Sequence, residues 1–149
     1  MESIEPRPDQ FRSLVAASEA PGGDDRSIMM INLLRFADEA SYPADFDAEP
    51  CSGAEAYRRY GEAAQSFLEK VGGEPIWAAP AHGVVIGPEG ESWDVAFGVR
   101  YPSRKAFLAM ATDPGYLAIV PHRSAALADS RLILCDVPGP GAPEVFGLG

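Results

Sequence analysis

The sequence predicts an α+β domain with a four-stranded antiparallel sheet, two main helices on one face of the sheet and an added N-terminal helix. Three observations predict this class. A short, continuously apolar segment precedes a long amphipathic one, two strand-like segments follow, and a second helical region leads into a last strand-like segment. The resulting order, β-α-β-β-α-β, is that of the split βαβ motif.

A length of 149 residues fits one domain with one core. We divide it into an N-terminal helical extension (1–26), the main domain (27–137) and a Pro/Gly-rich tail (138–149). Within the extension, Asp9 can cap a helix over residues 9–20. Residues 28–34 are too short and too evenly apolar for an amphipathic helix and predict a buried first strand.

The middle of the chain predicts a loop, a helix and an antiparallel pair of strands. Residues 37–53 are rich in Pro and acidic residues and form the loop, whereas apolar residues recur every three or four positions over 54–71. A strand is expected over 75–87, bent at 80–83, and a further strand over 93–101.

Ser103 can cap the second helical region, which Asp113-Pro114-Gly115 interrupts. A further helical stretch is expected over 115–127, with a break or kink at Pro121. The last strand is predicted over 131–137. The whole order is that of the ferredoxin-like fold.

The predicted third strand has two different faces. Val95, Phe97 and Val99 suit packing against helices, and they alternate with small or polar residues: Asp94, Ala96, Gly98 and Arg100. A single sheet leaves this second face bare. We therefore expect a partner subunit to cover it, or a cavity to lie against it.

Charge and composition exclude several classes of protein. The 12 basic and 22 acidic residues give a formal charge of -10, which disfavours nucleic acid as a partner. No apolar run approaches the roughly 20 residues of a membrane helix, and the first residues lack the features of a signal peptide, so we expect a cytoplasmic protein. Cys51 and Cys135 have no ligand-like spacing, and we expect neither a metal nor a cofactor.

Several segments resemble the domain of unknown function 1330 family over roughly residues 27–137. They are Asn32-Leu33-Leu34-Arg35-Phe36, Gly53-Ala54-Glu55-Ala56-Tyr57, Trp93-Asp94, Arg100-Tyr101-Pro102-Ser103-Arg104, Asp113-Pro114-Gly115-Tyr116, His122-Arg123 and Asp129-Ser130-Arg131-Leu132. The resemblance implies the dimeric α/β-barrel superfamily, in which two sheets pack face to face as a homodimer. That superfamily contains cofactor-independent monooxygenases, isomerases and cyclases as well as haem-dependent relatives, so the fold narrows the chemistry only by analogy.

Four polar residues are the main candidates for chemistry. Because Asn32 lies in an apolar strand, its side-chain amide needs hydrogen-bond partners, which Arg100, neighbouring backbone or a ligand can supply. Arg100 suits a carboxylate or enolate oxygen, although an ion pair with Asp94 or Asp136 explains it equally well. Asp94 or His82 is the candidate general base, and a surface position is the plainer interpretation of His82.

The aromatic residues Tyr57, Tyr60, Trp77 and Trp93 are candidates for contact with a flat substrate, although aromatic residues at such spacings are usually core. Arg35, from the first family-like segment, joins them as a substrate-binding candidate. His122 is expected to be a surface or capping residue. We expect Arg123 with Asp129, and Arg104 with Asp113, to form structural ion pairs or helix-end contacts rather than reactive groups.

These observations leave two main functional hypotheses, and analogy with the superfamily adds a third, a haem enzyme with His82 or His122 as the iron ligand. The first is a cofactor-independent isomerase, cyclase or monooxygenase whose pocket lies between the sheet and a covering helix and loop. There Arg100 and Asn32 hold an anionic oxygen of the substrate, and Asp94 or His82 moves a proton. The second is a non-catalytic ligand-binding or dimeric interaction module in which the same polar residues satisfy one another.

Overall fold

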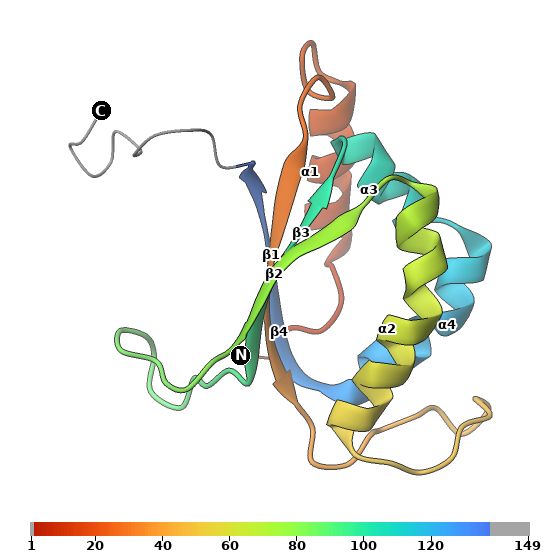
Figure 1. Ribbon diagram of the computed structural model, residues 1–149, viewed down its shortest axis with the longest axis vertical. Coiled ribbons are helices and arrows are strands. Elements are labelled where there is room, and N and C mark those ends of the chain that lie inside the picture. Colours follow the sequence, from red (N-terminus) through yellow and green to blue (C-terminus); the bar gives the residue numbers. More distant parts are fainter. Residues whose placement is uncertain (1, 138–149) are drawn as a thin grey trace.

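The computed structural model describes residues 2–137, and the expected tail at 138–149 lies outside the described residues. The elements are α1 (Pro8–Glu19), β1 (Ile28–Phe36), α2 (Gly53–Lys70), β2 (Glu74–Pro80), β3 (Val95–Tyr101), α3 (Arg104–Ala111), α4 (Pro114–Ala126) and β4 (Leu127–Asp136). The strands form one sheet in the order β2-β3-β1-β4, and every neighbouring pair is antiparallel. Figure 1 shows α2, α3 and α4 on one side of this sheet. The predicted ferredoxin-like α+β fold is confirmed.

The helices begin close to where the sequence predicts. The side chain of Ser52 accepts a hydrogen bond from the Glu55 amide and caps α2, and Ser103 caps α3 in the same way through the Ala106 amide. In α1 the expected cap is wrong, because Pro8 is the first helical residue and Arg7 occupies the N-cap position. Pro fits the first turn of a helix since it has no amide hydrogen to leave unpaired.

The strand prediction over residues 75–87 is wrong in its second half. β2 ends at Pro80, and residues 81–94 form a loop that projects from the side of the sheet opposite the helices (Figure 1). At its tip Val85 and Ile86 are 98% and 94% exposed. Three apolar residues in a row resemble a strand locally, but this segment has no partner strand, because β3 begins only at Val95.

The end of the chain also differs from the prediction. The helix α4 runs on through Pro121, so the expected break is absent. It packs along α2, and this tertiary packing outweighs the local cost of a proline within the helix. The strand β4 then follows directly and begins at Leu127, four residues before the predicted start at Arg131.

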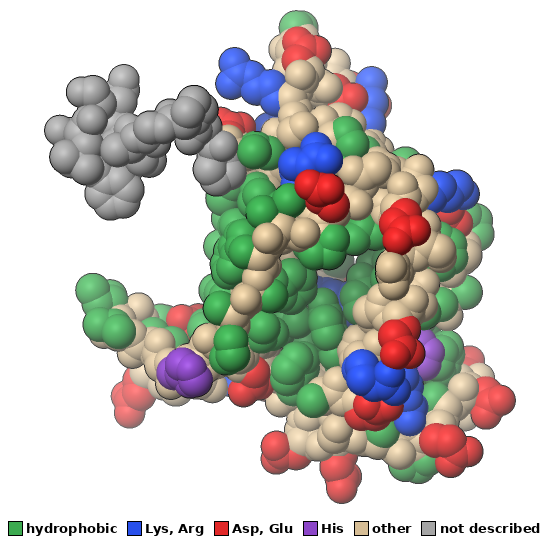
Figure 2. Space-filling model, viewed as in Figure 1, with side chains coloured by type: hydrophobic (Ala, Val, Ile, Leu, Met, Phe, Trp, Pro, Cys, Tyr) green, Lys and Arg blue, Asp and Glu red, His purple; other side chains and the backbone are tan. Residues whose placement is uncertain are grey.

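The two faces of the sheet are both largely apolar. On the helix side, Ile28, Met30 and Leu34 of β1 are buried in the core. On the other side, the indole of Trp77 lies over Gly98 beside Met29, where a Cβ on Gly98 would meet the Trp77 ring nitrogen at 2.3 Å. Figure 2 shows apolar side chains gathered on this helix-free side. The small or polar residues Ala96, Gly98 and Arg100 of β3 do lie on this side as expected, but the neighbouring strands make the face as a whole apolar.

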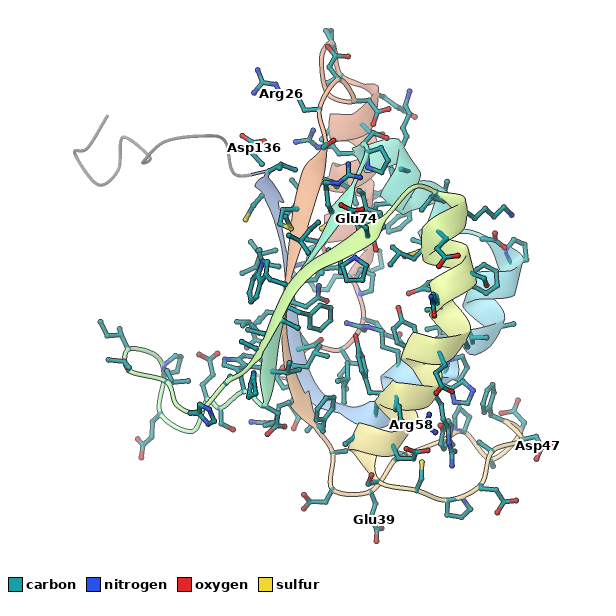
Figure 3. All side chains as sticks on the ribbon, in the orientation of Figure 1. Arg26, Glu39, Asp47, Arg58, Glu74 and Asp136 are labelled. Carbon is teal, nitrogen blue, oxygen red and sulfur yellow. The ribbon has the colours of Figure 1, made fainter. Side chains whose placement is uncertain are left out.

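Charged side chains such as Glu39, Asp47 and Arg58 point away from the body of the domain (Figure 3). Among the described residues, no helix has the length and hydropathy that crossing a membrane requires.

Candidate functional site

A cavity of about 1160 Å³ lies between the helix side of the sheet and the helices. Figure 2 shows the hollow between the strands and α2. One wall is the N-terminal segment, including Ile4 and Phe11, and the others come from β1, β3, β4, α2, α3 and α4. Much of the lining is apolar: Leu14, Met30, Phe97, Val99, Met110 and Val120. A cavity of this size and polarity is typical of small-molecule sites.

Three tyrosines, Tyr57, Tyr60 and Tyr116, line this cavity. Tyr57 and Tyr60 share one side of α2 because residues three apart on a helix are neighbours, and Tyr116 comes from α4. The hydroxyl oxygens of Tyr60 and Tyr116 lie 2.7 Å apart. Burial raises the pKa of Tyr57 to about 12, and burial raises the pKa of Tyr60 further above its usual value. Both phenols therefore stay protonated near neutral pH and can act as hydrogen-bond donors.

Arg123 brings a positive charge to the same cavity. It lies in the last turn of α4, and its Nη1 donates a 2.7 Å hydrogen bond to the Ile4 carbonyl oxygen. Its positive charge lowers the pKa of Tyr57 and of Tyr60 and so partly offsets the rise that burial causes. The expected ion pair with Asp129 is wrong. Within residues 2–137, no carboxylate lies within ion-pair distance of Arg123.

Asn32 lies in the floor of the cavity, on the helix side of β1, and is only 7% exposed. Its side-chain amide donates a 3.2 Å hydrogen bond to the Met30 carbonyl oxygen. Of the partners expected from the sequence, neighbouring backbone is therefore the one present. One further N–H of that amide and the side-chain carbonyl remain to interact with a molecule in the cavity.

Residues 3–7, which we call the strap, cross the end of the cavity before α1. The Ser3 amide donates to Asp129 at 2.8 Å, and the Ser130 hydroxyl donates to the Ser3 carbonyl oxygen at 2.7 Å. Burial would raise the pKa of Asp129, but the Ser3 amide and Arg131 outweigh this and hold the pKa below its usual range. The Ser124 hydroxyl also donates to Glu5 at 2.9 Å. The strap is thus tied to α4 and β4.

The structure does not bring Arg100 and Asp94 together. Arg100 lies at the end of β3, where its guanidinium is 3.6 Å from Glu74 and 3.4 Å from the Ser27 hydroxyl. Asp94 precedes the opposite end of the same strand and accepts a 2.7 Å hydrogen bond from the Phe36 amide. It shares a shallow, open pocket with Arg35. Neither expected ion pair of Arg100, with Asp94 or with Asp136, is present.

The other predicted residues also lie outside the cavity. His82 is exposed on the 81–94 loop, and Trp77 lies on the helix-free face of the sheet. The ring of Trp93 packs against the Arg131 guanidinium at 5.1 Å from the ring centre.

His122 is half-buried rather than a surface residue, and its Nδ1 lies 2.7 Å from the Tyr42 hydroxyl. Burial, helped by the charge of Arg59, lowers the pKa of His122. The expected Arg104–Asp113 ion pair is also absent, although Asp113 does make a helix-end contact: it is the N-cap of α4 and accepts a hydrogen bond from the Gly115 amide. Arg104 donates to the Gly23 carbonyl oxygen at 2.6 Å, whereas Asp113 pairs with Lys70 at 3.3 Å.

Of the nine predicted site residues, the cavity therefore contains Asn32, Tyr57 and Tyr60. Tyr116 and Arg123 were not among them. Their spacing does carry a signal, because residues 116, 120 and 123 recur at intervals of four and three and share one face of a helix. The expected break at Pro121 hid this pattern, since a break would separate Tyr116 from Arg123.

A family model described as domain of unknown function 1330 matches residues 51–137, more than half of the chain. The chain belongs to this family. In a crystal structure of a protein of unknown function from Rhodopseudomonas palustris, the sequence is 36% identical, with a TM-score of 0.81 over 94% of this chain and 100% of that chain. The methylated form of that protein is 37% identical, with a TM-score of 0.81 over 95% and 98% of the two chains.

A more distant likeness shows the fold alone. The hydroxynitrile lyase from Passiflora edulis is 11% identical to this DUF1330 chain, with a TM-score of 0.50 over 80% of this chain and 99% of that one. No curated protein matches the chain.

Proposed function

We propose that this protein binds a small, mainly apolar molecule carrying a hydrogen-bonding oxygen in the cavity between the sheet and the helices. The convergence of the Tyr57 and Tyr60 phenols with the Asn32 amide in an apolar cavity carries this proposal. Donors in such surroundings bind an oxygen acceptor more strongly than they would in water, because the local dielectric constant is low.

A second candidate is cofactor-independent isomerisation, cyclisation or oxygenation of an enolisable or aromatic substrate. It is favoured by the same donors, since protonated phenols and an amide can stabilise a negative charge that develops on a substrate oxygen. The proton transfer first expected from Asp94 or His82 finds less support, because neither residue lines the cavity. The two candidates are separated by searching for a chemically altered product of any compound that binds.

The experiment is a thermal-shift screen of aromatic acids, lactones and quinones against three proteins. Ala64 lines the cavity, so Ala64→Phe should fill part of it, whereas Ala118→Phe adds the same ring to an exposed position on α4. A ligand at a hundred times its Kd should stabilise wild type and Ala118→Phe by about 2.7 kcal/mol. It should stabilise Ala64→Phe far less.

The same screen tests the earlier expectation for Arg100. If a ligand loses its effect in Arg100→Ala but keeps it in Ala64→Phe, the site lies on the helix-free face and the cavity proposal is wrong. A library in which no compound stabilises the wild type also contradicts the proposal.

We further propose that two copies pair through the helix-free face of the sheet. Trp77 is 42% exposed there and Ile133 is 50% exposed, and exposed apolar surface of this kind is typical of an interface. The half-buried residues Ile31 and Leu33 of β1 continue the same surface across the centre of the sheet.

Light scattering after size-exclusion chromatography should give twice the 15.9 kDa mass of the chain. Trp77→Glu should shift the protein to monomer, because it places a charge where apolar groups meet. Leu117→Glu on the helix side is the control and should stay dimeric, since Leu117 is already 53% exposed on α4. A wild type that is monomeric at micromolar concentration would rule out this pairing.

A further inference from the structure

We propose that Arg123 selects a ligand with one carboxylate, which takes the place of the Ile4 carbonyl oxygen on the guanidinium and so releases the strap. This inference rests on the proposed function, because it concerns the same cavity. It adds the chemical class of the ligand and a way for the cavity to open.

The surroundings of Arg123 favour an anion. Arg123 lines the cavity, where its guanidinium donates to a neutral carbonyl oxygen at 2.7 Å and lies near the phenol of Tyr57. No carboxylate among residues 2–137 pairs with it, although the chain has an excess of acidic residues. A guanidinium binds a carboxylate through two parallel hydrogen bonds, which are stronger than a bond to a neutral carbonyl. A carboxylate that enters the cavity can therefore displace Ile4.

The strap is positioned to respond to this exchange. Ile4 is held by Arg123, whereas Ser3 before it is held by Asp129 and Ser130. Ile4, Glu5, Pro6 and Arg7 all line the cavity. Loss of the Arg123 bond leaves this wall tied to α4 through the exposed Ser124–Glu5 hydrogen bond, while the bonds at Ser3 still anchor its start. The opening is thereby confined to residues 4–7 and the beginning of α1.

The rest of the cavity limits the ligand further. Its apolar walls suit a hydrocarbon or aromatic body, and the linked phenols of Tyr60 and Tyr116 can bind one more oxygen. Of the arginines that line the cavity, Arg7 pairs with Asp9 and Arg131 with Asp129, so within residues 2–137 Arg123 is the one without a carboxylate partner, in a protein of formal charge -10. These features favour an aromatic or aliphatic monocarboxylate over a dianion.

The test uses a matched pair of probes, an aromatic monocarboxylate from the screen and its methyl ester, on the full chain. Calorimetry measures the affinity, and hydrogen exchange with mass spectrometry follows the backbone amides of residues 2–14. The variants are Arg123→Gln, Arg123→Lys and, as a control, Arg104→Gln. Arg104 also donates to a backbone carbonyl, that of Gly23, but it does not line the cavity.

The carboxylate should bind wild type roughly ten- to hundredfold more tightly than the ester, and Arg123→Gln should remove this difference. Arg123→Lys should keep part of this difference in affinity, and Arg104→Gln should keep all of it. In wild type, the carboxylate should speed hydrogen exchange of residues 2–14 several-fold and slow exchange in α2. The ester should slow exchange in both regions. Arg123→Gln should exchange quickly in residues 2–14 even without a ligand.

The failures are distinguishable. If the two probes bind with equal affinity and substitution of Arg123 changes neither affinity, the proposed binding in the cavity stands and the selection by Arg123 is wrong. If the carboxylate prefers wild type but slows exchange in residues 2–14, the release of the strap is wrong. If neither probe binds any of the folded variants, the proposed function falls, and this inference falls with it.

Discussion

Leu34→Ala is expected to lower the free energy of unfolding by about 3 kcal/mol, within the range of about 2–5 kcal/mol for buried leucines. Leu34 is fully buried at 0% exposure. It lies in β1, the strand that pairs on both sides, and packs with Ala56, Ala126 and Leu127 at the end of the cavity-forming helices. Removing its side chain leaves a void that a backbone held on two sides cannot close.

Urea unfolding followed by circular dichroism measures this change. Val85→Ala is the matched control, because it also removes apolar carbons but from a side chain that is 98% exposed. It should change the free energy of unfolding by less than about 0.5 kcal/mol. A loss for Leu34→Ala that is no larger than that of the control would contradict the packing described above.

Gly53→Ala is expected to lower the free energy of unfolding by about 3 kcal/mol or more. A Cβ at Gly53 would lie 2.2 Å from the Ala37 carbonyl oxygen and 2.5 Å from the Ala126 carbonyl oxygen. Both obstacles are backbone atoms. The Gly53 amide also donates to the Ala37 carbonyl oxygen at 3.1 Å, so the two segments cannot separate without losing that bond.

Gly61→Ala provides the control within the same helix. A Cβ at Gly61 would meet nothing within 4 Å, and alanine stabilises a helix interior by roughly 0.5–1 kcal/mol relative to glycine. The two identical substitutions should therefore change the urea midpoint in opposite directions. If Gly53→Ala were neutral, the close approach of α2, the Ala37 segment and the end of α4 would be wrong.

Much of the fold could be read from local sequence patterns. The long apolar periodicity predicted residues 54–71 as a helix, and α2 spans Gly53–Lys70. The errors lie where a local sequence pattern is compatible with two different secondary structures. Val84, Val85 and Ile86 have the composition of a strand, yet a strand needs a neighbouring strand for its backbone hydrogen bonds, and the pairing of β2 with β3 ends at Pro80.

The candidate site was harder to predict because its parts are far apart in the chain. Asn32 could be identified as an unusual polar residue in an apolar strand, and it does line the cavity. Asp94 and Arg100 were grouped because they share a strand periodicity, but β3 begins after Asp94 and Arg100 lies at its other end. Alternation along a strand fixes the face on which a side chain lies, and it does not bring distant positions together.

The sequence by itself determined the order of the elements and the α+β class, because hydrophobic periodicity and capping residues act within a few positions of the chain, and the resemblance of several segments indicated the family. Only the tertiary structure decided that Arg123 faces Tyr57 and Ile4 rather than Asp129, and that the N-terminal strap forms a wall of the cavity. These contacts join residues more than sixty positions apart. They depend on how α4 packs against α2 and the sheet, which no local pattern specifies.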